Sequence, residues 1–235
     1  MTLQIWKWTT RSLVVGALLS VGCWADAQDT AKKATSLFDG KTLTGWSGLA
    51  DNWRVEDGAI TGENIAEKPL KNNTFLVCDK KVSDFELNLE FRIMGGNSGI
   101  QYRSKLIDAE KYIVGGYQAD IDANKRYMGI NYEERGRGIM VERGEIVAVN
   151  NQGAKSKVGT CGDATALLGR IKFDDWNRYR IVAKGSKLQH YINDVLMSEL
   201  QDDETAKRSA EGIIALQVHA GPPMKVQFKN ITLSE

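Results

Sequence analysis

Three polar side chains alternate with apolar ones in the segment from residue 116 to residue 122. The polar set is Gln118, Asp120 and Asp122, and the apolar set is Tyr117, Ala119 and Ile121. Successive strand side chains point to opposite faces, so this pattern predicts one β-strand with a buried face and a polar face. Carboxylates at i and i+2 would lie about 6.5–7 Å apart. Because Asp is disfavoured in strands and like charges repel, the row indicates a binding or catalytic site, with a solvated outer face as the alternative.

The only two histidines of the chain are the next candidates for chemistry. His219 follows Gln217 at i+2, so both side chains are expected on one face, beside a turn that holds two prolines. A neutral imidazole near pH 7 can accept or donate a proton. His190 is interpreted either as a core residue or as part of the site. We expect Asp120 and His219 to converge from adjacent strands in one hollow large enough for a sugar.

Two further segments add polar groups. Gln101 and Arg103 are expected to share a strand face, where Arg103 would donate to an oxyanion or a pair of sugar hydroxyls. A salt bridge at the rim is the alternative for this arginine. Tyr132 and Glu133 belong to a glycine-containing segment, residues 130–137, that we expect to cap a cleft.

A metal site is a weaker hypothesis. Neither histidine belongs to a spacing typical of zinc ligands. Asp120 and Asp122 together with a histidine from a neighbouring strand would form an oxygen-rich divalent cation site. No cofactor is otherwise indicated.

The N-terminal segment has the pattern of a signal peptide. Basic Lys7 and Arg11 precede a short apolar run over residues 13–21, and Ala25-Asp26-Ala27 is a typical cleavage site. The run is too short to span a bilayer. We therefore expect residues 1–27 to be removed and the protein to be exported to the periplasm or the extracellular space. Lipidation at Cys23 is less favoured because Ser20 stands where such sites usually have Leu.

Cleavage removes two of the 31 basic residues and one of the 30 acidic residues, so the mature chain has a net charge near zero. A nucleic-acid partner is therefore not expected, since phosphate binding needs a clustered basic face. The sequence does not indicate an oligomeric state. Cys78 and Cys161 remain after cleavage, and either a disulfide or two separate thiols fits their spacing.

The remaining chain reads as short strands separated by turns. Residues 28–36 are expected to be a flexible mature N-terminus and residues 37–235 a single domain. Hairpins are predicted over residues 53–61, 138–149 and 176–197, and one helical turn or two over residues 202–209. Many strands without alternating helices favour an all-β antiparallel sandwich.

The segments resemble, in order and spacing, the 3-keto-disaccharide hydrolase domain family, formerly domain of unknown function 1080. The matching pieces are Leu37–Trp46, Trp53–Ile60, Gly96–Arg103, Gly116–Asp120, Trp176–Arg180, Tyr191–Asn193, Gly212–Gly221 and Phe228–Ile231. The resemblance implies a concanavalin-like jelly roll in an exported bacterial protein that acts on sugars oxidised at C3. Many relatives in that family have Glu-x-Gln-x-x-Asp on the central strand, where this chain has Gln-x-Asp-x-Asp. Gln118 cannot be an ionised nucleophile, so ordinary retaining hydrolysis is disfavoured.

A ketone at C3 makes a different reaction possible. It acidifies the hydrogen on C2, so a base can form an enolate, the C1 substituent can leave, and water can add to the enone. We expect Asp120 or His219 to be the base and Glu133 the acid for the leaving group. Arg103, or a divalent ion on Asp120 and Asp122, would stabilise the enolate. The groups expected to bind or orient the substrate are Gln118, Asp122, Tyr132, His190 and Gln217.

The leading hypothesis is thus an exported carbohydrate-active enzyme that cleaves 3-keto-glycosides, by hydrolysis or by elimination and hydration. A non-catalytic, lectin-like sugar-binding module is the alternative, because fold does not fix function. A structural domain of a cell-surface assembly is a third reading, and it predicts a flat apolar patch without a cleft. The enzyme is favoured if the polar row around Gln118 lies at the base of a cleft together with His219.

Overall fold

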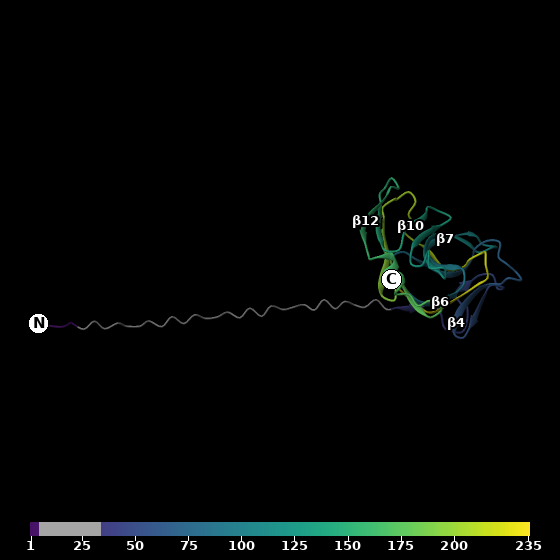
Figure 1. Cartoon of the computed structure of the whole chain (residues 1–235), viewed down its shortest axis with the longest axis horizontal. Coiled ribbons are helices and arrows are strands. Elements are labelled where there is room, and N and C mark those ends of the chain that lie inside the picture. The colour runs from purple at the N-terminus through teal and green to yellow at the C-terminus, as the bar shows by residue number, and fades with distance from the viewer. Residues whose placement is uncertain (5–33) are drawn as a thin grey trace. The chain divides into compact units, whose positions relative to one another are not determined.

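The computed structural model describes residues 1–4 and 34–235. Residues 34–235 form a sandwich of two β-sheets (Figure 1). Apart from residues 1–4, the expected signal peptide lies outside the described residues, as do its cleavage site and residues 28–33. Thr35 and Ser36 belonged to the expected flexible N-terminus, but they form strand β1 (Thr35–Ser36), which pairs with Leu233 and Thr232.

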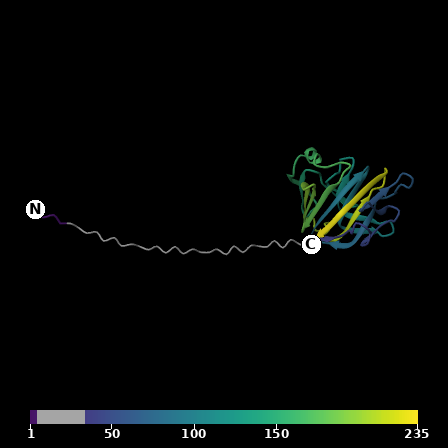
Figure 2. The same cartoon turned by 90° about the horizontal axis from the view of Figure 1, so that it is seen from below.

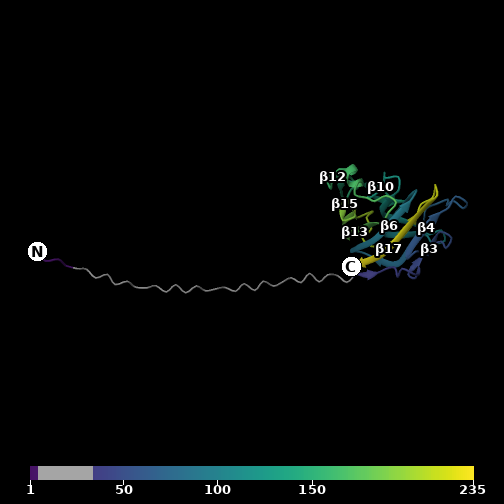
Figure 3. The same cartoon turned by 60° about the horizontal axis from the view of Figure 1, so that its bottom comes forward.

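The larger sheet has ten strands within the described part of the chain. Their order is β12 (Lys155–Thr160), β11 (Glu145–Val149), β15 (Val195–Asp202), β14 (Lys187–Ile192), β13 (Asn177–Lys184), β6 (Phe85–Met94), β17 (Met224–Ser234), β4 (Ala59–Asn64) and β3 (Trp53–Glu56), with β1 on β17. Figure 3 shows β17, in yellow, running between β6 and β4. The pairs are antiparallel except β11 with β15, which is parallel.

The smaller sheet has seven strands in the same described residues. Their order is β10 (Gly138–Val141), β9 (Asn131–Glu134), β8 (Ile113–Asp122), β7 (Asn97–Asp108), β16 (Gly212–Val218), β5 (Thr74–Val82) and β2 (Trp46–Ser47). The described residues contain one short helix, α1 (Ala164–Leu168), at the periphery of the domain (Figure 2). Among the described residues there is no helix long and apolar enough to cross a bilayer.

The main core lies between the sheets and follows the two-residue period of the strands. On β8 the inward side chains of Tyr117, Ala119 and Ile121 are buried, as the alternation predicts. Gln118 and Asp120 point the other way, yet they are only 2% and 5% exposed. The polar face of this strand is therefore covered and is not a solvated surface.

The cover comes partly from the β7–β8 hairpin, which bends over the outer face of the smaller sheet. The Tyr112 carbonyl at its tip accepts a hydrogen bond from the Phe75 backbone N–H of β5. Val114 packs there in a small second apolar cluster with Phe75. The pairing of β7 with β8 shifts register twice near this bend. At Gly116 (φ 140°) a Cβ would lie 2.5 Å from Ser104 Oγ, so only glycine fits.

Several local expectations are confirmed and others are wrong. The hairpin at Asp57-Gly58 forms as predicted, with positive φ at both turn residues. The hairpin predicted over residues 138–149 does not form, because β10 pairs with β9 in one sheet and β11 joins the other sheet. Of the helical turn or two predicted over residues 202–209, the structure has a single hydrogen-bonded turn, in which the Glu204 carbonyl accepts from the Lys207 and Arg208 backbone N–H groups. Cys78 and Cys161 are both free thiols rather than a disulfide.

Candidate active site

A pocket of about 650 Å³ opens on the outer face of the smaller sheet. Such a volume suits a small ligand. Its polar lining includes Asn73, Asn97, Gln118, Asp120, Asp122, Tyr132, Glu134, Gln217 and His219. Asp120 and His219 thus share one hollow, as expected, but their strands are not adjacent. β7 lies between β8 and β16, and Gly99 is the β7 residue opposite Asp120.

A chain of hydrogen bonds fixes the Asp120 carboxylate from below. Ser104 Oγ donates to Gln101 Oε1 (2.6 Å), and Gln101 Nε2 donates to Gln118 Oε1 (2.7 Å). Gln118 Nε2 then donates to Asp120 Oδ1 (2.7 Å). Within residues 34–235, no hydrogen bond engages the second oxygen, Oδ2. Asp120 therefore presents one anchored and one available carboxylate oxygen.

The Gln118 side chain lies over Gly99. A Cβ at that glycine would come within 2.5 Å of Gln118 Cδ, so the missing side chain makes room for the amide. Burial raises the pKa of Asp120 well above 3.8, and the nearby Asp122 and Glu134 charges add to the increase. The Gln118 hydrogen bond opposes it. A carboxylate with a raised pKa is a stronger base than an ordinary aspartate.

Asp122 has a structural task at the rim of the pocket. Its Oδ1 accepts from the Asn124 backbone N–H (2.9 Å) and its Oδ2 from the Tyr127 backbone N–H (2.9 Å). The carboxylate therefore holds the loop that follows β8 and places Tyr127 at the pocket edge. Tyr127 is 42% exposed, with the Arg126 guanidinium over its ring.

Glu134 and His219 are a second pair of ionisable groups that line the same pocket as Asp120. Burial raises the pKa of Glu134, while Arg135, His219 and Asn73 oppose the increase. The Nδ1 atom of His219 contacts the Ala220 carbonyl oxygen. A carbonyl only accepts hydrogen bonds, so Nδ1 carries the proton and Nε2 has the free lone pair in the neutral ring. The pocket thus combines two carboxyl groups of raised pKa with one imidazole.

A family model described as the 3-keto-alpha-glucoside-1,2-lyase-like domain matches residues 33–234. The chain belongs to this family. The family expected from the sequence motifs is thereby confirmed, and it indicates a carbohydrate-active protein.

The lyase-like domain is also similar to a curated relative, the 3-keto-disaccharide hydrolase of Bacteroides thetaiotaomicron, with 34% identity over 83 residues. That match covers 32% of this chain and 29% of the relative.

Solved structures support the fold. A Parabacteroides distasonis protein, provisionally assigned as a glycosyl hydrolase, has a TM-score of 0.57 at 18% identity over 87% of this chain and 100% of its own. Carbohydrate-binding module CBM66 of Bacillus subtilis has a TM-score of 0.54 at 19% identity, covering 81% and 96%. A Bacillus subtilis protein with a galectin-like fold has a TM-score of 0.56 at 11% identity, covering 86% and 94%. The concanavalin-like jelly roll expected from the sequence is confirmed.

Three predicted site residues of the lyase-like domain lie outside the pocket. The first is Arg103, which is 1% exposed. Its guanidinium donates to the Ser83 carbonyl (2.6 Å), the Gly185 carbonyl (2.7 Å) and Asp84 Oδ1 (2.9 Å). Arg103 has φ 47° at the register shift of β7, so the bulge breaks the alternation that would place it beside Gln101. It ties two turns together instead of facing a sugar.

Glu133 and His190 are the other two. Glu133 Oε2 accepts from Arg137 Nε (2.5 Å), and the following residue, Glu134, lines the pocket in its place. His190 is fully buried between the sheets, with Nε2 2.8 Å from the Tyr102 hydroxyl and Nδ1 3.2 Å from the Ile130 carbonyl. It is a core residue and not a substrate ligand.

Strand parity could have found both corrections. Tyr132 and Glu134 are two residues apart and share the pocket face, whereas Glu133 is on the opposite face. His190 shares its face with Leu188 and Ile192, which are both core residues. Asn73 and Asn97 were not predicted, and their isolated amides carried no sequence signal.

The described side chains do not by themselves form the suggested cation site. Both Asp122 oxygens accept backbone N–H groups, which leaves Asp120 as the available carboxylate of the pair. No group of three or more His, Cys, Asp or Glu side chains suited to a metal gathers within residues 1–4 and 34–235.

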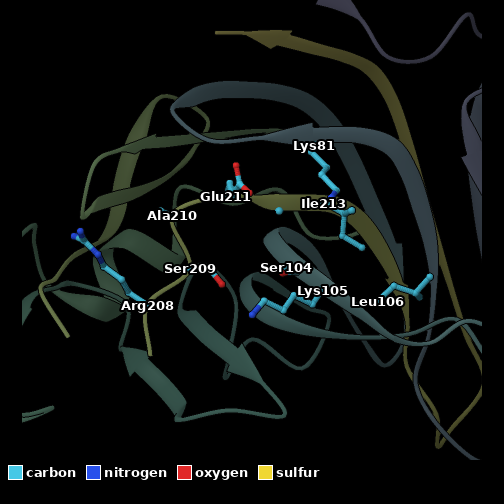
Figure 4. A pocket seen from close by; sticks show the side chains of 10 residues that line it. Lys81, Ser104, Lys105, Leu106, Arg208, Ser209, Ala210, Glu211 and Ile213 are labelled. Carbon is cyan, nitrogen blue, oxygen red and sulfur yellow. The ribbon is translucent and has the colours of Figure 1, made fainter. Parts of the chain in front are cut away.

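A second hollow of about 530 Å³ lies beyond the bent hairpin (Figure 4). Lys81 and Lys105 approach it, and Ser104 lies at its back. None of the polar residues predicted for the site lines this second hollow.

Proposed function

We propose that this protein is an exported enzyme that cleaves 3-keto-glycosides by elimination at C1–C2 followed by hydration. The observation that carries the proposal is Asp120: one oxygen is anchored by Gln118, the other is available, and burial raises its pKa inside a sugar-sized pocket. Membership of the lyase-like family supports the substrate class.

Asp120, Glu134 and the pocket amides have defined tasks in the proposed reaction. Asp120 Oδ2 takes the proton from C2, and the electron pair moves toward the C3 ketone oxygen to give an enolate. The enolate collapses to an enone as the C1–O bond breaks, and Glu134 donates its proton to the departing oxygen. Water then adds at C1 while C2 regains a proton. Amide N–H groups in the pocket replace Arg103 as donors to the enolate oxygen.

The grouping of ionisable residues favours an enzyme over a binding module. Asp120, Glu134 and His219 line one pocket, whereas sugar-binding modules often depend on an exposed aromatic platform and need no such set. The third reading, a docking domain, predicted a flat apolar patch without a cleft. The 650 Å³ pocket and its polar lining favour the enzyme over that reading.

Turnover of a chromogenic 3-keto-α-glucoside tests the proposal. The chain starting at Gln28 should release the leaving group, and Asp120→Asn should reduce kcat by about 10²–10⁴-fold. Asp57→Asn, at the exposed turn between β3 and β4, is the matched control and should leave kcat unchanged. No release by the unmodified chain, or equal rates in both variants, would reject the proposal.

A further inference from the structure

Among the described residues, Gln217 is the one fully buried pocket amide whose side-chain hydrogen-bonding groups have no protein partner. It lies near the end of β16, and its side chain is fully buried. Neither Oε1 nor Nε2 meets a hydrogen-bond partner within residues 34–235. Burying an amide without a hydrogen-bond partner destabilises the folded protein. This pair of groups therefore needs a partner from outside the chain.

The side chain faces the pocket because of strand parity. Its neighbours Leu216 and Val218 both pack in the main core, so Gln217 points to the opposite side. It lines the same pocket as His219, which is two residues further along the chain. The backbone around it is fixed, since the Gln217 carbonyl accepts from Ser98 Oγ at 2.6 Å.

Gln118 and Gln217 differ in whether their side-chain amides already have protein partners. Both amide groups of Gln118 are used, one by Gln101 and one by Asp120, so Gln118 is an internal support. Gln217 offers an unused donor and an unused acceptor side by side. Its complement is a ligand with an acceptor and a donor on neighbouring carbons. A ketone next to a hydroxyl has that pattern.

We propose that Gln217 clamps the oxidised edge of the sugar, with Nε2 donating to the ketone oxygen and Oε1 accepting from a neighbouring hydroxyl. The inference rests on the proposed function and adds a specificity determinant to it. The same N–H then faces the oxygen on which negative charge develops when C2 loses its proton. Gln217 thus both positions the ketone and stabilises the enolate.

Two substitutions separate the two halves of the clamp. Gln217→Glu keeps the size and the acceptor but removes the donor when it is ionised, so it should disfavour a ketone and still accept from a hydroxyl. Gln217→Met removes both. Calorimetric binding of a methyl 3-keto-α-glucoside and of methyl α-glucoside would be measured at about pH 8, in an Asp120→Asn background that slows turnover.

The expected pattern is specific to the clamp. Gln217→Glu should weaken keto-sugar binding by about 10- to 100-fold while changing glucoside binding less than about threefold. Gln217→Met should weaken both. Thermal unfolding checks that each variant is folded.

Three results would overturn the inference. The first is a keto-sugar affinity within about threefold of that of the Gln217 chain in both variants. The second is an equal loss of affinity for both sugars in Gln217→Glu, and the third is no binding of the keto-sugar to the Gln217 chain. Turnover by the chain with Asp120 intact judges the proposed function separately. A chain that turns over the keto-sugar but ignores these substitutions would reject only the clamp.

Discussion

The buried, ionised side chain of Asp120 destabilises the folded protein near neutral pH, and the same burial makes the carboxylate a stronger base. Its folded pKa is raised above 3.8, so the folded protein keeps this proton to higher pH than the unfolded chain does. The contribution to stability is fully present below the unfolded pKa and is lost as the pH rises through the folded pKa. A buried catalytic base of this kind lowers the free energy of unfolding and at the same time serves the reaction.

Asp120→Asn should therefore raise the free energy of unfolding at about pH 7, because it removes the buried charge while Gln118 can still donate to the new amide oxygen. The same substitution slows turnover. The gain should shrink as the pH falls from the raised folded pKa to 3.8, and it should vanish below 3.8, where the aspartate is protonated in both states. Urea unfolding of both proteins at the two pH values measures it. A variant less stable at neutral pH would contradict the burial argument.

Glu134 and Glu133 are neighbours with different expected roles. Glu134→Gln should slow release of a poor leaving group, such as methoxide, more than release of nitrophenolate, because only the poor leaving group needs a proton. Glu133→Gln should change stability but not this ratio, since its partner is Arg137. Rates for both substrates with both variants give the comparison. Equal sensitivity to the leaving group in the two variants would exclude Glu134 as the acid.

The row of amides acts as one element across β7 and β8. Ser104→Ala removes the first donor of the chain that ends at Asp120, and Gly99→Ala would push a Cβ into Gln118. Both should lower kcat with little change in the binding of unoxidised glucoside, and Gly99→Ala should have the larger effect. The pH at which the acidic limb of the rate profile falls should also move in both variants. An unchanged profile would show that Asp120 does not depend on these amides.

A buried ionic cluster joins the β9–β10 turn to the end of β15. Arg137 contacts Glu133, Asp202 (2.6 Å) and Glu204 (3.0 Å), and Tyr117 donates to Asp202. Arg137→Met would leave the 1% exposed Asp202 carboxylate buried without its cation. We expect a loss of about 3–5 kcal/mol in the free energy of unfolding, measured by urea titration. A loss below 1 kcal/mol would show that the cluster is dispensable.

The strands were largely predictable, but their sheet partners were not. The alternation of apolar and polar residues identified β6 and both faces of β8, because side chains alternate between the two faces of a strand in any sheet. The hairpin prediction over residues 138–149 was wrong because local turn residues do not reveal that β10 and β11 belong to different sheets. The predicted position of the Arg103 side chain was wrong because no sequence pattern identifies a bulge with positive φ at this residue.

At the scale of the whole domain, His190 makes the free energy of unfolding depend on pH. Burial lowers its pKa from 6.5 to about 3, so the folded protein keeps it neutral while the unfolded chain takes up a proton. Its contribution is present above pH 6.5 and is lost as the pH falls toward 3. His190→Gln should flatten the stability curve between these values. An unchanged slope would contradict this assignment.

Breaking of the C2–H bond is the central claim for the molecule. A 3-keto-α-glucoside carrying deuterium at C2, turned over in ordinary water and sampled early by mass spectrometry, tests it directly. An enzyme-free incubation corrects for spontaneous exchange next to the ketone. The account predicts slower release than from the protiated substrate and a product without deuterium at C2. Release at an equal rate with all deuterium retained would contradict it, because direct hydrolysis leaves that bond intact.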